Sequence, residues 1–156
     1  MIEIAIPGAP TLELRHLVLD YNGTLACDGE LLPGVAALLS ELANKIAIHV
    51  VTADTFGKVG SALATVPCKV SVLAPGNQDQ AKLAYVAQLG CEHAVCIGNG
   101  RNDRLMLEAA ALGIAVVQRE CASADALKAA DVIAPDIVAA LELLTHPLRL
   151  AATLRV

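Results

Sequence analysis

Residues 16–24 read His16-Leu17-Val18-Leu19-Asp20-Tyr21-Asn22-Gly23-Thr24. The apolar half is typical of a strand buried in a parallel sheet, and α/β sheets bind ligands beyond the carboxyl ends of such strands. We expect Asp20 to be exposed at that end and Gly23 to allow a tight backbone reversal after it. An acid beside a hydroxyl residue suits phosphoryl transfer to the carboxylate. The pattern equally suits a strand followed by an Asx-type turn.

The rest of the chain favours the first interpretation. The apolar residues 46–51 are followed by Thr52, and Lys82 lies early in a predicted helix over Gln78–Leu89. A third apolar run, residues 94–97, leads into Gly98-Asn99-Gly100-Arg101-Asn102-Asp103. The chain therefore presents, in order, an aspartate, a threonine, a lysine and a glycine-rich polar turn that contains an acid.

This order resembles the haloacid dehalogenase superfamily of phosphatases and P-type ATPases. The resemblance runs over about residues 17–140 and is closest to the phosphorylation domain of the P-type ATPases. That domain reads Asp-Lys-Thr-Gly-Thr at its first motif and Gly-Asp-Gly-x-Asn-Asp at its last. Residues 98–117, with Asn-Asp, Leu-x-x-Ala and Gly-Ile-Ala, are very similar to the last block. The chain is identified as a soluble, P-type-ATPase-like member of the superfamily.

The resemblance implies a role for each motif residue. Asp20 would attack phosphorus, form an aspartyl phosphate and give one oxygen to Mg²⁺. The backbone carbonyl of Asn22, together with Asn99 or Asp103, would complete the protein's share of the magnesium ligands. Lys82 would neutralise charge on Asp20 and on the phosphoryl group. The remaining phosphate contacts would come from Thr52 and from the backbone around Asn22, Gly23 and Ala53.

Two residues depart from the pattern of the superfamily. Many of its phosphatases carry a second Asp two residues after the nucleophile, where this chain has Asn22, which holds no transferable proton. General acid–base catalysis is typically worth roughly 10²–10⁴-fold, so we expect slow turnover. Asn99 stands where Asp is usual, which removes one anionic ligand and predicts weaker metal affinity.

Three functions therefore stay open. The first is a magnesium-dependent phosphatase or phosphotransferase that acts through Asp20. The second is a catalytically impaired domain that binds phosphate or a protein. The third is a receiver-like signalling domain, which also gathers Asp, Thr and Lys around magnesium. Receivers carry an acidic pair after their first strand and the phosphorylated Asp after their third, whereas Asp20 here stands just before Gly23-Thr24.

Strands and helices alternate along the chain, which predicts an α/β fold with a Rossmann-like, mainly parallel sheet and helices on both faces. Residues 2–6 and 12–14 predict a β-hairpin at the sheet edge. Pro33 is predicted to begin a helix at its first position, and Asn77 to cap the helix that carries Lys82. The predicted strands are 17–20, 45–51, 69–73, 94–97, 114–117 and 132–133; the predicted helices are 33–44, 56–64, 78–89, 102–111, 122–129, 135–144 and a last segment after His146-Pro147.

The spacing of the motifs predicts a single domain over residues 1–156 without a cap domain. The intervals from Thr24 to Thr52 and from Thr52 to Lys82 hold only single helices, strands and turns. The site would then be open. An open site admits a phosphoprotein as well as a phosphorylated small molecule, unless a neighbouring subunit in a homo-oligomer covers it.

Composition excludes several function classes. The chain of 156 residues has 11 basic and 16 acidic side chains, two Tyr, one Phe and no Trp, which argues against a nucleic-acid partner. It is 56% hydrophobic, yet no uninterrupted apolar stretch approaches the ~20 residues that span a bilayer, so we expect no membrane partner.

The first residues lack a signal-peptide pattern, which predicts a cytoplasmic protein. Its five Cys show no C-x-x-C spacing and its four His no metal spacing, and His49 is predicted to be a satisfied strand residue.

Overall fold

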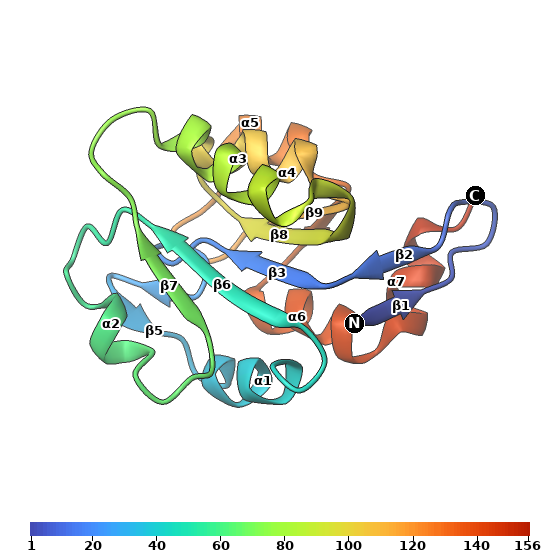
Figure 1. The fold of residues 1–156 in the computed structure, drawn as a ribbon, viewed down its shortest axis with the longest axis horizontal. Helices are drawn as coiled ribbons and strands as arrows, with labels where there is room; N and C mark the ends of the chain where they lie inside the picture. Colours follow the sequence, from blue (N-terminus) through green and yellow to red (C-terminus); the bar gives the residue numbers. More distant parts are fainter.

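The computed structural model describes residues 1–156 and is built on a six-stranded parallel sheet (Figure 1). The strand order is β10-β9-β8-β3-β6-β7, which places β3, the strand that ends before Asp20, among the central strands. The register pairs Leu19 of β3 with Val50 of β6 on one side and with Ile97 of β8 on the other. The strands are β3 (His16–Leu19), β6 (Ala47–Thr52), β7 (Lys69–Val72), β8 (Ala94–Gly98), β9 (Leu112–Val116) and β10 (Val132–Ala134).

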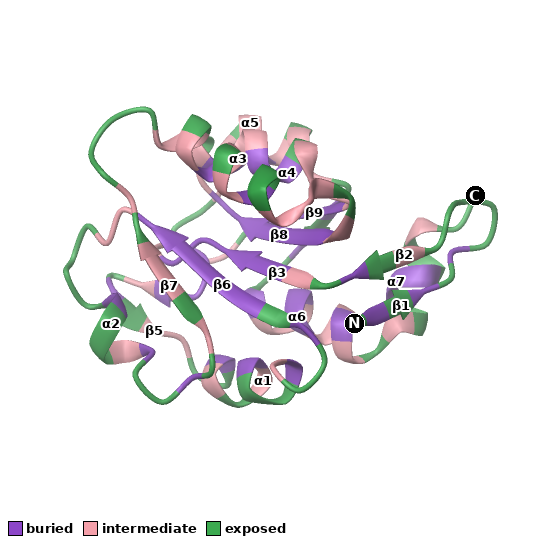
Figure 2. Cartoon of the chain, viewed as in Figure 1, coloured by how far each residue is buried: buried purple, intermediate pink, exposed green.

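Helices cover both faces of the sheet, as the sequence predicts (Figure 1). Alternate side chains of a strand point to opposite faces, so Leu17 and Leu19 join a core of 31 buried residues while Val18 joins a second core of eight. The central strands are buried throughout most of their length (Figure 2). One face carries α1 (Val35–Leu42) and α6 (Ile137–Thr145); the other carries α3 (Gln78–Leu89), α4 (Arg104–Ala109) and α5 (Ala124–Ala129).

The predicted N-terminal hairpin forms, but it is not part of the main sheet. Strands β1 (Ile2–Ile4) and β2 (Leu12–Leu14) make their own two-stranded antiparallel sheet, in which Ile2 pairs with Leu14. The hairpin lies beside α7 (Pro147–Leu154), as Figure 1 shows, and the backbone N–H of Val156 donates to the carbonyl of Pro7. It extends away from the sheet because β2 leads directly into β3 without a turn that would bring it alongside.

A second small hairpin, which the sequence analysis did not predict, follows the Asp20 loop. Strands β4 (Ala26–Cys27) and β5 (Glu30–Leu31) pair antiparallel, and we refer to residues 26–31 as the flap. The Tyr21 hydroxyl donates to the Gly29 carbonyl across 3.0 Å, and Lys58 forms an ion pair with Glu30. Two-residue strands are too short to show an alternating pattern, which explains why the flap was missed.

Several predicted helix boundaries are wrong. The first helix begins at Val35 because Gly34 adopts a left-handed conformation (φ 84°) after Pro33. Asn77 is itself left-handed (φ 39°) and its side chain makes no capping bond. Left-handed Gly57 (φ 64°) lies within the helix expected over 56–64, which is shortened to α2 (Val59–Ala62). The helix expected over 102–111 divides into a 3₁₀ turn, η2 (Arg101–Asp103), and α4, and a second 3₁₀ turn, η1 (Cys91–His93), precedes β8.

None of the helices is by itself long and apolar enough to span a membrane. The consecutive helices α6 and α7 pass the same length and composition criteria only when they are taken together, and their axes are bent by 101° at the break between them.

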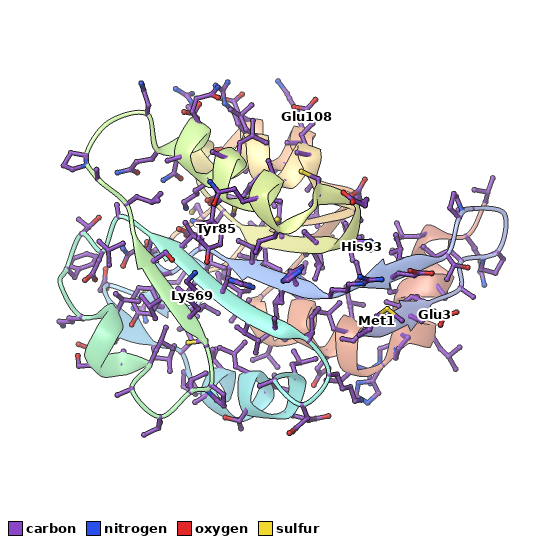
Figure 3. All side chains as sticks on the ribbon, viewed as in Figure 1. Met1, Glu3, Lys69, Tyr85, His93 and Glu108 are labelled. Carbon is purple, nitrogen blue, oxygen red and sulfur yellow. The ribbon has the colours of Figure 1, made fainter.

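His49 is a hydrogen-bonded strand residue, as the sequence predicts. Its Nδ1 lies 3.0 Å from the Tyr85 hydroxyl on α3, and its Nε2 lies 3.2 Å from Nδ1 of His16. The Lys69 amine lies over the Tyr85 ring, 5.8 Å from its centre (Figure 3). Burial lowers the pKa of His49, and the nearby His16 and Lys69 lower it further. The folded protein therefore favours a neutral imidazole at this position.

We expect His49 to make the fold sensitive to acid. The pKa of His49 is lower in the folded chain than the ordinary value of 6.5, so below that pH the unfolded chain binds a proton that the folded chain resists. This contribution to stability is complete above pH 6.5 and is lost as the pH falls. Urea unfolding at pH 8, 6.5 and 5 should therefore show wild type losing more stability than His49→Gln. A constant gap between the two proteins would contradict this assignment.

Candidate active site

The predicted site residues meet at the carboxyl edge of the sheet. Asp20 directly follows β3, Thr52 ends β6 and Asn99 directly follows β8, and these three strands are neighbours. The backbone N–H of Asp20 donates to the carbonyl of Ile97 across 3.0 Å, which continues the β3–β8 pairing to the strand end. Because the strands are parallel, their polar ends face one another around Asp20.

Lys82 lies between two carboxylates. Its amine is 2.6 Å from Oδ1 of Asp20 and 2.6 Å from Oδ1 of Asp103. The expectation of an exposed Asp20 is wrong: Asp20 is 6% exposed, and Lys82 and Asp103 are fully buried. Lys82 reaches this position because α3 begins near the carboxyl edge and directs the face shared by Lys82 and the buried Val86 toward the sheet.

The charges of this triad affect one another strongly. Burial raises the pKa of Asp20, and the neighbouring Asp103 raises it further. Lys82 and Thr24 lower this pKa in part, and it lies at about 6. Burial alone would lower the pKa of Lys82, but the two carboxylates outweigh burial and raise it above its ordinary value. At neutral pH Lys82 is therefore charged and Asp20 is mostly ionised, which is the state that a nucleophilic carboxylate requires.

Asp103 holds the glycine-rich turn in place. Its Oδ2 accepts the backbone N–H groups of Asn99, at 3.0 Å, and Gly100, at 2.8 Å, while its Oδ1 accepts from Lys82. Both carboxylate oxygens are thus engaged by the chain. Asn99 instead presents its amide oxygen to the Thr24 hydroxyl and donates from Nδ2 to the Cys121 carbonyl across 3.0 Å.

Thr24 connects the two sides of the site. Its hydroxyl lies 3.1 Å from Oδ2 of Asp20 and 3.2 Å from Oδ1 of Asn99. Gly23 makes this approach possible, because a Cβ at its left-handed backbone (φ 80°) would lie 2.3 Å from Nδ2 of Asn99. The N–H of Gly23 already donates to the Ala26 carbonyl across 2.9 Å, so Gly23 has a steric role and its amide is not free for phosphate.

Other donors beside Asp20 remain free. The Thr52 hydroxyl oxygen accepts the N–H of Asp54 at 3.0 Å, and its own proton donates no hydrogen bond within the chain. The backbone N–H groups of Ala53 and Asn22 donate no hydrogen bond within the chain. These groups are consistent with the predicted phosphate contacts.

The oxygens around Asp20 suit a hard divalent cation. The carbonyl oxygen of Asn22 accepts no hydrogen bond, and its side-chain Oδ1 is buried without a partner. The Asp20 carboxylate and the amide oxygen of Asn99 both contact the Thr24 hydroxyl, at 3.1 Å and 3.2 Å. Carboxylate, carbonyl and amide oxygens are the protein ligands that Mg²⁺ accepts, so the residues present fit the predicted ion.

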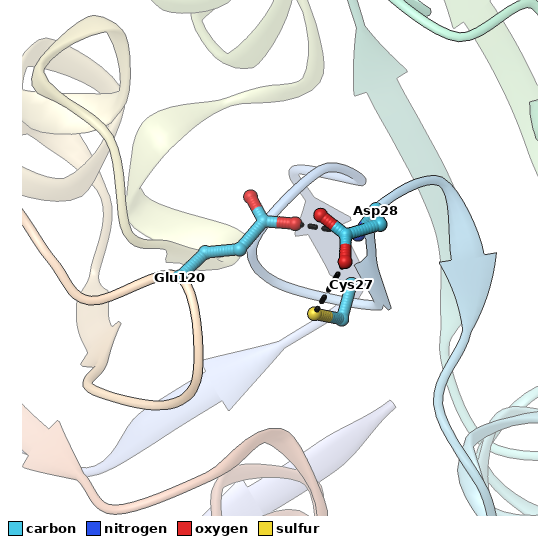
Figure 4. Close-up of side chains that lie close together, drawn as sticks. All are labelled: Cys27, Asp28 and Glu120. Carbon is cyan, nitrogen blue, oxygen red and sulfur yellow. Dashed lines mark hydrogen bonds between the residues drawn. The ribbon is translucent and has the colours of Figure 1, made fainter.

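Sequence reasoning missed the segment after β9. The Gln118 amide donates to the carbonyls of Gly23, at 2.9 Å, and Thr24, at 2.7 Å. Figure 4 shows Glu120 accepting the backbone N–H of Asp28 on the flap across 2.7 Å, with the Cys27 thiol 3.9 Å from the Asp28 carboxylate. Burial raises the pKa of Cys27, and Asp28 and Glu120 add to the effect, so this thiol stays protonated. The signal for Gln118 was its position just beyond a strand that ends at the same sheet edge.

Known structures share this architecture. The 3-deoxy-D-manno-octulosonate 8-phosphate phosphatase of Moraxella catarrhalis, solved with magnesium and phosphate ions, is 15% identical, with a TM-score of 0.72 over 86% of this chain and 87% of its own. The corresponding Haemophilus influenzae phosphatase in its cobalt-bound form is 13% identical, with a TM-score of 0.71 over 92% and 94%. A phosphoserine phosphatase is 14% identical, with a TM-score of 0.68 over 85% and 98%.

The chain has the haloacid dehalogenase fold.

Sequence comparison adds one relative. An uncharacterised protein of Methanocaldococcus jannaschii is 39% identical over 84 residues, which are 51% of this chain and 90% of the archaeal protein. No protein-family model matches the chain. The α/β fold that the sequence predicts by its resemblance to the haloacid dehalogenase superfamily is confirmed by these solved structures.

Within this haloacid dehalogenase fold, short segments border the site. Between Thr24 and Thr52 the chain forms only the flap, α1 and β6, and between Thr52 and Lys82 it forms α2, β7 and the first turn of α3. The flap is thus the one folded element inserted directly after the Asp20 loop.

Proposed function

We propose that this protein is a magnesium-dependent phosphoric monoester hydrolase that acts through an aspartyl phosphate on Asp20. The observation that carries the proposal is the buried Lys82, whose amine contacts both Asp20 and Asp103 at 2.6 Å. A fully buried lysine between two carboxylates at a strand end is costly to form for structure alone, and such perturbed groups cluster at functional sites.

In the first step, a carboxylate oxygen of Asp20 attacks the phosphorus of a phosphomonoester, and the bond from phosphorus to the leaving oxygen breaks. Lys82 balances the negative charge that gathers on the phosphoryl group. The free N–H groups of Ala53 and Asn22 and the Thr52 hydroxyl donate to the phosphoryl oxygens. The leaving oxygen takes its proton from water, because Asn22 has none to give.

In the second step, water attacks the phosphorus of the aspartyl phosphate, which releases inorganic phosphate and restores the Asp20 carboxylate. The chain places no carboxylate at position 22 to remove a proton from this water. This step therefore lacks general-base assistance, and we propose that it limits turnover.

Magnesium would be held by the Asp20 carboxylate, the Asn22 carbonyl and Asn99, and it would supply positive charge beside the phosphoryl oxygens. Asp103 is fully buried and accepts three hydrogen bonds, from Lys82 and from two backbone N–H groups of the glycine-rich turn, so we propose that it supports the ion site through Lys82 and Asn99. The Moraxella phosphatase with the same fold was solved with magnesium and phosphate ions, which supports this choice of ion.

The substrates that we propose are a phosphorylated small molecule or a phosphoprotein in the cytoplasm. A catalytically impaired phosphate-binding domain is the second candidate. It is favoured by Asn22 and Asn99, which replace two acids of the superfamily pattern with neutral amides.

One experiment separates these functions. The protein is incubated with Mg²⁺ and either p-nitrophenyl phosphate or acetyl phosphate, and both phosphate release and the phosphorylation of the Asp20 peptide are followed. Turnover supports the hydrolase, and a trapped adduct without turnover supports a phosphotransferase. Phosphate binding with neither result favours the impaired domain.

We expect Asn22→Asp to raise steady-state turnover and to shorten the lifetime of the phosphorylated Asp20. The new carboxyl group supplies an acid and a base two residues from the nucleophile, an effect typically worth roughly 10²–10⁴-fold. The rate of p-nitrophenyl phosphate hydrolysis and the decay of the labelled Asp20 peptide measure the two effects.

The added charge at position 22 also changes the affinity for magnesium, so the comparison is made at saturating Mg²⁺. Gln88→Glu is the control for added charge alone, because Gln88 is exposed on α3 and its side chain makes no hydrogen bond. An unchanged rate and an unchanged adduct lifetime would show that Asn22 does not limit the reaction.

A further inference from the structure

Residues 118–123, which follow β9, contact the loop after Asp20, the flap and Asn99, and we refer to them as the clamp segment. Gln118 binds the loop after Asp20, Glu120 binds the flap, and the Cys121 carbonyl accepts from the side chain of Asn99. The backbone N–H of Ser123 donates to the Asn99 carbonyl across 2.9 Å. None of these residues belongs to the motifs of the sequence analysis.

Gln118 makes the most specific of these contacts. Its Nε2 donates to the carbonyls of both Gly23 and Thr24, and its Oε1 accepts the N–H of Ile137, the first residue of α6, at 3.0 Å. The two carbonyls accept no other hydrogen bond. One half-buried side chain therefore ties the loop after Asp20 to a helix that packs on the sheet.

The position of this loop sets the position of the reacting groups. The Thr24 hydroxyl contacts both Oδ2 of Asp20 and Oδ1 of Asn99. A shift of the Thr24 backbone therefore displaces a hydroxyl group that contacts both of these residues. Displacement of a catalytic group by about 1 Å can reduce a rate by roughly 10²-fold. Loss of the Gln118 bonds leaves the Gly23 and Thr24 carbonyls unpaired next to such groups.

The geometry points to Gln118 as a positioning residue that fixes the loop of residues 21–24 and thereby orients Asp20 and Asn99. The effect of Gln118 on catalysis rests on the proposed function. The anchoring of the loop by Gln118 is a property of the fold, and it is measured separately.

Three variants test the role of Gln118. Gln118→Ala removes all three bonds. Gln118→Glu keeps an acceptor for the N–H of Ile137 but has no donor for the two carbonyls. Asp136→Ala is the matched control, because Asp136 also caps α6, accepting the N–H of Ala139 at 2.7 Å, without touching the loop.

The first readout is hydrolysis of p-nitrophenyl phosphate at varied substrate and Mg²⁺ concentrations. We expect both Gln118 variants to lose roughly 10–100-fold in kcat with a KM changed less than about threefold, because the phosphate donors on β6 and α3 are retained. The Mg²⁺ concentration for half-maximal rate should rise. Asp136→Ala should lower Tm as Gln118→Ala does and keep the wild-type kcat.

The second readout is amide hydrogen exchange without substrate or metal. The N–H groups of Leu25 and Ala26 both donate to the Tyr21 carbonyl within the loop. We expect their exchange to become at least about tenfold faster in both Gln118 variants and to be unchanged in Asp136→Ala.

Unchanged exchange in the Gln118 variants would overturn the anchoring role, and faster exchange with wild-type kcat would overturn the role in catalysis. If wild type hydrolyses no phosphomonoester, the proposed function fails. The exchange data and a calorimetric Mg²⁺ titration then decide the role of Gln118 alone. Weaker Mg²⁺ binding in Gln118→Ala than in Asp136→Ala supports that role, and equal binding overturns it.

Discussion

Asp20→Asn is expected to abolish phosphatase turnover and the formation of a phosphorylated peptide. An amide is a poor nucleophile toward phosphorus, and loss of a nucleophile typically lowers kcat by roughly 10⁴-fold or more. Mass spectrometry of the trapped protein and hydrolysis of p-nitrophenyl phosphate measure the two effects. Asp28→Asn on the flap is the matched control, and it should keep wild-type turnover.

The same variant should fold at least as well as wild type. Burial and the neighbouring Asp103 raise the pKa of Asp20 to about 6, so its ionised form at pH 7 is less favourable in the folded chain than in the unfolded chain. A neutral amide removes that penalty, while Lys82 keeps its contact with Asp103. Retained activity in Asp20→Asn would show that another group is the nucleophile.

Lys82→Ala is expected to abolish activity and to destabilise the fold strongly. Its amine is the shared partner of Asp20 and Asp103, and all three side chains are buried. Removing one member of a buried charge cluster typically costs about 3–5 kcal/mol, a large part of a total stability of about 5–15 kcal/mol. Urea unfolding in metal-free buffer measures the loss. Lys128→Ala, on an exposed part of α5, should change stability little.

A double variant separates charge from packing. Lys82→Met with Asp103→Asn replaces the buried cation and one of its partners with neutral side chains of similar size. We expect it to recover much of the stability lost in Lys82→Ala and none of the activity. If Lys82→Ala unfolds at the same urea concentration as wild type, the two carboxylates are not held by Lys82.

The sequence predicted which residues form the site better than it predicted their burial and the contacts around them. Asp20, Thr52 and Asn99 were found because each follows an apolar run, and parallel strands bring their carboxyl ends to one edge. The burial of Lys82 was missed, although Val86 lies one turn later on the same helix face and is fully buried. The sequence predicted that Lys82 acts on Asp20, but it gave no sign of burial, because the two carboxylates that contact Lys82 lie 62 residues before it and 21 residues after it.

Contacts that depend on tertiary structure had at most a positional signal in the sequence, with nothing in the residue type to mark them. Gln118 acts through backbone carbonyls about 95 residues away, and any side chain with an amide at that point of the fold would appear the same in sequence. Asn77 was expected to cap α3 with its side chain, but its left-handed backbone offers only a carbonyl, which accepts the N–H of Ala81. The parallel sheet was predictable because its strands are long enough to show their pattern.

The tight packing around the site limits how the chain can evolve. A Cβ at Gly98 would lie 2.5 Å from Cγ of Asp103, and one at Gly23 would lie 2.3 Å from Nδ2 of Asn99. Neither glycine offers a functional group, yet a side chain at either would displace a residue of the site. A substitution that introduces an acid at position 22 or 99 therefore has to change the charge of the site while keeping the close approach of Gly23 and Gly98 to their neighbours.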